Sequence, residues 1–103
     1  MTADASASPS KEQFAAQLNK SFRAAGPNGQ HFEMTLVEFK DEFDSETQET
    51  FSLTFKAPYD APIQQSTYTL TNEQMGEQHV FLVPLSQDAE GLYYQAVFNR
   101  FKQ

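Results

Sequence analysis

The C-terminal third of the chain decides the fold, through HVFLVPL at residues 79–85 and YYQAVFNR at residues 93–100. Both runs are rich in β-branched and aromatic residues, and the polar, glycine-containing segment 86–91 separates them. We therefore predict two neighbouring strands joined by a turn. Pro84 cannot donate a backbone hydrogen bond, so we expect its strand to lie at an edge or to end there.

Upstream of this pair, apolar residues alternate with polar ones in three segments, 32–36, 51–55 and 66–70. A short strand at 21–24 precedes them, and a bulge near Val37 would explain a change of phase there. Together these segments predict a mainly β fold, a small antiparallel β-sandwich or barrel of five to seven strands.

The N-terminal region predicts one short helix after a flexible arm. Residues 1–9 are small and polar and read as the arm. Ser10 and Gln13 have the spacing of a capping box, and we expect the helix to span residues 10–20. Its narrow apolar stripe could close one end of a barrel. Residues 10–103 then form a single β-rich domain.

The segment 41–49 is polar and acidic, and we predict that it is a hairpin loop. Its carboxylates could in principle hold calcium. However, their spacing does not fit an EF-hand loop, and the glycine that the sharp turn of such a loop needs is absent. We expect a solvated loop and no metal.

Composition limits the class of function. The 103 residues suit one domain, and ten Phe and four Tyr supply an aromatic core. A net charge of -7 argues against nucleic acid and anionic membranes as partners. No apolar run approaches the roughly 20 residues that span a bilayer. Residues 1–8 do not resemble a signal peptide, so we expect a cytoplasmic protein by default, with later release or surface assembly left open.

No residue pattern points to catalysis or to a cofactor. The chain has no cysteine, which excludes disulfides and thiol chemistry. The two histidines, His31 and His79, lie outside any ligand-spaced cluster, and we expect them at the surface or at strand ends. Neither a serine-nucleophile motif nor a glycine-rich phosphate loop is present. We therefore expect a protein that is not an enzyme.

The tyrosines suggest a hypothesis about protein contacts. A tyrosine side chain is apolar along its ring and polar at its hydroxyl, which suits interfaces where one end is buried and the other meets water. Since neighbours alternate along a strand, Tyr93 and Tyr94 cannot both face the core. The outward one could form a stripe for a partner or a second copy, and the other would be a core residue. The interface candidates are Tyr93, Tyr94, Val97, Phe101 and Tyr59.

The region from Pro62 to Arg100 resembles a family of small bacterial domains of unknown function, DUF6916. The resemblance rests on Phe22, on the segment 62–70, on Gly76, and on the FLVP and YQAVFN motifs at residues 81–84 and 94–99. Ser66 and Asn72 depart from the family pattern, where Gly and His are usual. Members look like companions of phage-tail-like collar proteins, so the resemblance implies an assembly role without implying any site residue.

We therefore expect a non-enzymatic structural or accessory domain. It would assemble with itself or with a phage-tail-like or extracellular protein, through an exposed β edge or an aromatic strand face. The alternative is a small barrel that binds an apolar or carbohydrate ligand in its mouth.

Overall fold

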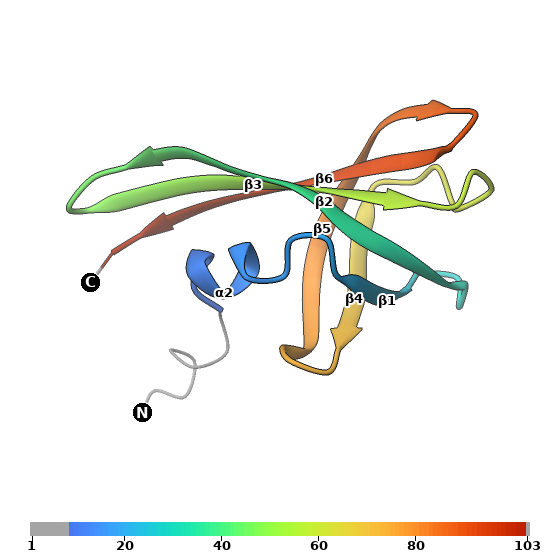
Figure 1. The fold of residues 1–103 in the computed structure, drawn as a ribbon, viewed down its shortest axis with the longest axis horizontal. Helices are drawn as coiled ribbons and strands as arrows, with labels where there is room; N and C mark the ends of the chain where they lie inside the picture. The colour runs from blue at the N-terminus through green and yellow to red at the C-terminus, as the bar shows by residue number, and fades with distance from the viewer. Residues whose placement is uncertain (1–8, 103) are drawn as a thin grey trace.

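Six antiparallel strands and one short helix make up residues 9–102, the part of the chain that this computed structural model describes (Figure 1). The elements are α2 (Lys11–Ala15), β1 (Ser21–Ala25), β2 (His31–Asp44), β3 (Gln48–Ala57), β4 (Ser66–Asn72), β5 (Gly76–Asp88) and β6 (Gly91–Phe101). The strands close into a barrel in the order β1-β2-β3-β6-β5-β4. The predicted β-rich class is confirmed. The predicted N-terminal arm lies outside the described residues except for Pro9.

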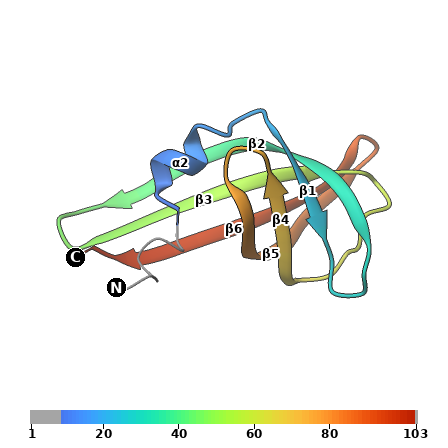
Figure 2. The same ribbon diagram turned by 90° about the horizontal axis from the view of Figure 1, so that it is seen from below.

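Two long strands bend and change partners, and this closes the barrel. β2 pairs with β1 over residues 31–35 and with β3 over residues 35–44. β5 pairs with β4 over residues 76–82 and with β6 over residues 83–88. As a result β4 and β5 cross β3 and β6 steeply, while β2, β3 and β6 run on together as a long ribbon (Figures 1 and 2).

The interior is filled by aromatic and aliphatic side chains at alternate strand positions. On β3 these are Phe51, Leu53 and Phe55, each fully buried, as the alternation of this segment predicts. Tyr68 and Leu70 of β4 also face inward, as predicted. Phe22 meets Phe55 edge to face at 5.5 Å, and Tyr68 lies 5.4 Å from Tyr94, both measured between ring centroids. The rings therefore pack against one another.

α2 begins as predicted but ends earlier than predicted. The Ser10 hydroxyl accepts from the Gln13 backbone and the Gln13 side chain accepts from the Ser10 backbone, so the capping box is present. The helix stops at Ala15 instead of residue 20, and the chain turns through Asn19 at a φ of 70°. Leu18 is 41% exposed, so a further helical turn would gain little stability from the burial of apolar side chains.

The predicted hairpin at 41–49 is present, but the predicted length of its loop is wrong. β2 continues to Asp44 and β3 begins at Gln48, so the turn is only Ser45–Thr47. The Ser45 hydroxyl accepts from the backbone of Thr47 and Gln48 and stabilises this tight turn. Strand residues here are polar because the hairpin projects beyond the barrel, where water reaches much of its surface. The predicted bulge near Val37 is present as a register shift between Leu36 and Glu38.

Pro84 does not end its strand, since β5 runs on to Asp88. It occupies a register shift between Pro84 and Ser86, beyond the last residue of β5 that pairs with β4. The missing N–H of the proline therefore costs no hydrogen bond between β5 and β4. The inward residues of this strand are Val80 and Leu82, while Phe81 and Leu85 are exposed.

Candidate functional site

The end of the β2–β3–β6 ribbon carries a strand edge without a partner. β6 pairs with β5 only as far as Gln95, which lies opposite Val83. From Ala96 to Phe101 it pairs with β3 alone. Within residues 9–102 no other strand covers this edge, so we call residues 96–101 the free β6 edge. Its outward backbone groups are available to another chain.

The inner face of the ribbon is covered by the helix. Between ring centroids, Phe14 of α2 lies 5.2 Å from Phe98 and 6.0 Å from Phe51. The rings of Phe51 and Phe98 stack on each other at 4.8 Å. The Arg100 guanidinium lies 5.1 Å from the centre of the Phe51 ring, and its Nη1 is 3.9 Å from a Glu49 carboxylate oxygen. Burial lowers the pKa of Arg100 and Glu49 opposes that change. Arg100 Nη2 is buried without a hydrogen-bond partner in the described part of the chain.

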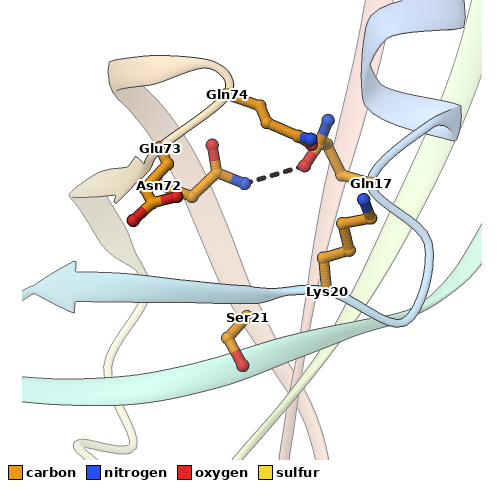
Figure 3. Close-up of a pocket in the computed structure, with 6 residues that line it drawn as sticks. All are labelled: Gln17, Lys20, Ser21, Asn72, Glu73 and Gln74. Atoms are coloured by element: carbon orange, nitrogen blue, oxygen red, sulfur yellow. Dashed lines mark hydrogen bonds between the residues drawn. The ribbon is translucent and has the colours of Figure 1, made fainter.

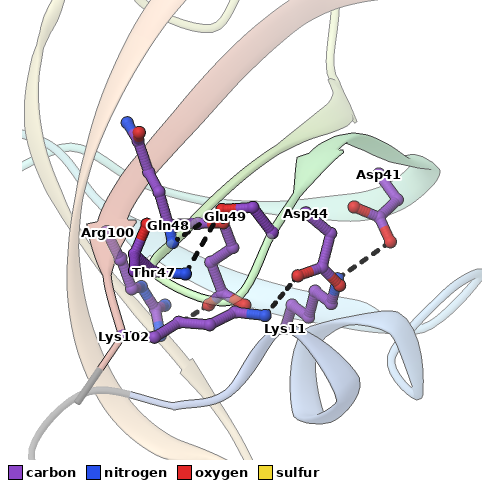
Figure 4. A network of polar contacts seen from close by, with 9 residues as sticks. Lys11, Asp41, Asp44, Thr47, Gln48, Glu49, Arg100 and Lys102 are labelled. Carbon is purple, nitrogen blue, oxygen red and sulfur yellow. Dashed lines mark hydrogen bonds and ion pairs between the residues drawn. The ribbon is translucent and has the colours of Figure 1, made fainter.

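Ion pairs fasten both the helix and the C-terminal segment to the hairpin (Figure 4). Lys11 Nζ donates to Asp41 Oδ2 at 2.9 Å and to Asp44 Oδ2 at 2.6 Å, and Lys102 Nζ donates to Asp44 Oδ1. The hydrogen bond from Lys102, with that from Lys11, lowers the pKa of Asp44 to about 2. The hydrogen bonds of Lys11 to Asp44 and Asp41 raise the pKa of Lys11.

These acidic residues therefore act as partners for ammonium groups. The calcium alternative finds no support in their arrangement, because the Asp41 and Asp44 carboxylates converge on a lysine. Across residues 9–102, no group of three His, Cys, Asp or Glu side chains is placed to hold a metal ion.

The outer face of the ribbon end is exposed and partly apolar. Val97 is 57% exposed, Phe101 is 81% exposed and Phe43 is 53% exposed. Phe43 pairs with Thr50, which pairs with Asn99, so all three lie in one row across the ribbon. The Thr50 hydroxyl donates to Asn99 Oδ1 at 2.5 Å. We call Phe43, Val97 and Phe101 the outer apolar group.

The structure separates the interface candidates that the sequence grouped. Tyr93 faces outward and is half-buried, while Tyr94 is fully buried and its hydroxyl donates to the carbonyl oxygen of Pro62. Tyr94 is thus a core residue and cannot be a surface contact, because the even positions of β6 face inward. Burial raises its pKa. Tyr59 is exposed but follows the end of β3 that lies opposite Leu92, far along β6 from Val97 and Phe101.

The two histidines do not form a site together. His31 pairs with Ala25, Ala25 pairs with Thr69 and Thr69 pairs with His79, so strands β1 and β4 lie between them. His79 Nδ1 is 3.3 Å from the Thr69 hydroxyl, and both side chains are at the surface.

Sequence reasoning missed two features of the surface. Phe43 lies among acidic residues in the sequence, and only the strand structure of 41–44 places it in the same row as Asn99, across β3. The second feature is an open polar groove of about 290 Å³ between the segment that follows α2 and the β4–β5 turn (Figure 3). It is lined by Gln17, Lys20, Ser21, Asn72, Glu73 and Gln74. Asn72 Nδ2 donates to Gln17 Oε1 at 2.9 Å. No local pattern predicts this groove, since its two sides are far apart in sequence.

The fold and its free edge describe a small β-barrel domain with an open strand at one end. The model of one family, "Domain of unknown function (DUF6916)", matches residues 9–98. The chain therefore belongs to the DUF6916 family. No curated protein and no solved structure matches it. In the part of the chain that the structure describes, no helix has the length and apolarity needed to cross a membrane.

Proposed function

We propose that this chain is a non-enzymatic structural or accessory domain that assembles with protein partners through the end of its β2–β3–β6 ribbon. The observation that carries the proposal is the free β6 edge beside Val97 and Phe101. An open edge with exposed apolar side chains is the arrangement that binds an added strand, since backbone bonds supply affinity and alternate side chains supply selectivity.

The rest of the ribbon end supports this role by being held in place. Phe14 and the ion pairs of Lys11 and Lys102 fix its inner face, so the edge is presented on a preorganised element. Preorganisation lowers the entropy that an interface loses on binding. Partners of phage-tail-like or extracellular type are supported by the sequence resemblance. The net charge of -7 supports a partner other than nucleic acid.

The proposal is tested by cross-linking and affinity capture of the tagged full-length chain in its native host. We compare the wild type with a Val97→Lys/Phe101→Lys variant, and with Ile63→Lys as a control. Ile63 is 67% exposed and lies in the loop between β3 and β4, away from the ribbon end. The wild type and the control should retain the same partner, which the double variant should lose. Equal recovery by all three folded proteins would contradict the proposal.

A second candidate function is binding of a carbohydrate in the polar groove. Three amide side chains, Gln17, Asn72 and Gln74, line it, and amides pair well with sugar hydroxyls. The test is the melting temperature in the presence of a carbohydrate panel, because a ligand that binds only the native state raises it. A shift that Asn72→Ala abolishes would favour this function. Absence of any shift in the wild type would argue against it.

A further inference from the structure

We infer that the occupant of the free β6 edge is a second copy of this chain, paired antiparallel about a two-fold axis at Asn99. The inference rests on the proposed function and names its partner. The free part of β6 begins at Ala96, directly after the last pair with β5, and the strand is followed by Lys102. Lys102 extends the free segment by one residue, because its N–H donates to the carbonyl oxygen of Thr47 at 2.8 Å and so continues the pairing with β3. Asn99 is the midpoint of residues 96–102, so only a two-fold axis there pairs the whole segment.

The side chains of β6 are complementary to themselves in this register. On the outer face, Val97 of each copy lies opposite Phe101 of the other, and the two Asn99 side chains meet at the axis. On the inner face, Phe98 lies opposite Arg100, an extension of the contact that Arg100 already makes with the Phe98 ring at 5.3 Å. Apolar and aromatic cross-strand pairs of this kind stabilise antiparallel sheets.

Neighbouring registers are less favourable. An axis at Arg100 places two guanidinium groups directly opposite each other, which is destabilising. An axis at Phe98 pairs only residues 96–100, because Phe101 would then face Gln95, whose edge is already occupied by Val83. Phe101, the most exposed of the large apolar side chains in residues 9–102, would gain no partner.

The other edge of the ribbon is protected against the same pairing. β2 has register shifts between Leu36 and Glu38 and between Asp41 and Phe43. Bulges and charged side chains are the usual means of blocking an edge strand. By contrast, β6 pairs with β3 from Leu92 to Phe101 without a shift. With one competent edge on its ribbon, each copy forms a closed dimer, whereas two such edges would allow an open filament.

A strand pair of seven residues is a small contact, below the roughly 1,200 Å² of standard interfaces, so we expect a weak dimer. The first test is sedimentation equilibrium of the full chain up to about 1 mM, with Asn99→Lys and Asn99→Asp variants. Each variant alone puts like charges opposite each other at the axis and should weaken dimerisation about fivefold. An equimolar mixture should restore association, because Lys then meets Asp.

The matched control is the same charge pair at Asn28, an exposed residue in the turn between β1 and β2. Asn28→Lys and Asn28→Asp should each dimerise as strongly as the wild type, and mixing the two should not strengthen their association. A second readout uses the absence of cysteine from the chain. Asn99→Cys should oxidise to a covalent dimer much faster than Asn28→Cys, since only the former brings two thiols together at the axis.

A wild type that stays monomeric, or an Asn99 mixture that associates no better than its components, would overturn the second copy as the occupant. The capture experiment tests the proposed function independently of the dimer. If the protein is monomeric and Val97→Lys/Phe101→Lys still loses a partner that Ile63→Lys retains, the edge binds a different protein. If capture is also unchanged, both the dimer and the assembly role are wrong.

Discussion

Tyr94 is one of two buried tyrosines whose hydroxyls tie the loop between β3 and β4 to the core; the other is Tyr68, which donates to the carbonyl oxygen of Gln64. The Oη of Tyr94 donates to the carbonyl oxygen of Pro62, while the ring is fully buried. Tyr94→Phe leaves that carbonyl without a donor, so we expect the free energy of unfolding to fall by about 1 kcal/mol. Urea denaturation measures the change. Tyr59→Phe is the control, since Tyr59 is exposed, and equal stability of the two variants would contradict the role given to Tyr94.

Asn19 is the residue that ends the helical segment and directs the chain into β1. Its φ of 70° lies in the left-handed region, which asparagine tolerates better than most residues. Asn19→Ala should lower the free energy of unfolding by about 1 kcal/mol, because a Cβ without a compensating polar group is strained there. Asn19→Gly should be at least as stable as Asn19→Ala in thermal unfolding. The reverse order would show that the backbone conformation does not limit this site.

At the scale of elements, the main apolar contact of α2 is made by Phe14. The ring is 1% exposed and sits against Phe51 and Phe98. Phe14→Ala should lower the free energy of unfolding by about 3 kcal/mol, through lost burial and the cavity left behind. Leu18→Ala, at a residue that is 41% exposed, should have a much smaller effect. If both variants unfold at the same urea concentration, the helix does not depend on this contact.

The strands show where prediction from sequence succeeds. The alternation at Phe51, Leu53 and Phe55 predicted a strand with one buried face, and the structure confirms it. The hairpin at 41–49 was predicted, but the strand structure of its two arms was missed, for a physical reason. Its residues pair as strands, but the strands project beyond the barrel and are exposed to water on much of their surface. Their side chains are therefore mostly polar and lack the alternation of apolar and polar residues by which a strand is predicted.

At the scale of the whole molecule, Asp44 joins three segments, because its carboxylate pairs with Lys11 of the helix and Lys102 of the C-terminal segment and lies in the hairpin itself. Its pKa is lowered from 3.8 to about 2 in the folded chain. A lowered pKa means that the folded state binds fewer protons, so the stabilisation is complete above about pH 4 and is lost as the pH falls towards 2. We expect Asp44→Asn to be less stable than the wild type at neutral pH.

The measurement is the urea midpoint of both proteins between pH 2 and pH 7. The difference between wild type and Asp44→Asn should be constant above about pH 5 and should shrink below pH 4. Glu46→Gln, in the hairpin turn, is the control, because no ion pair of Glu46 is present in the described residues. A difference that does not change with pH would show that the ion pairs of Asp44 do not stabilise the fold.

By itself the sequence determined the β-rich class, the capping box at Ser10 and the requirement that only one of Tyr93 and Tyr94 face the core. These depend on local period and on backbone preferences, which neighbouring residues set. Tertiary structure alone decided that Tyr94 is the inward one, that Phe43 lies on the same outer face as Val97 and Phe101, and that β6 has a free edge. Each of these depends on which distant strand lies alongside, and on where β5 ends its pairing with β6, which no local pattern contains.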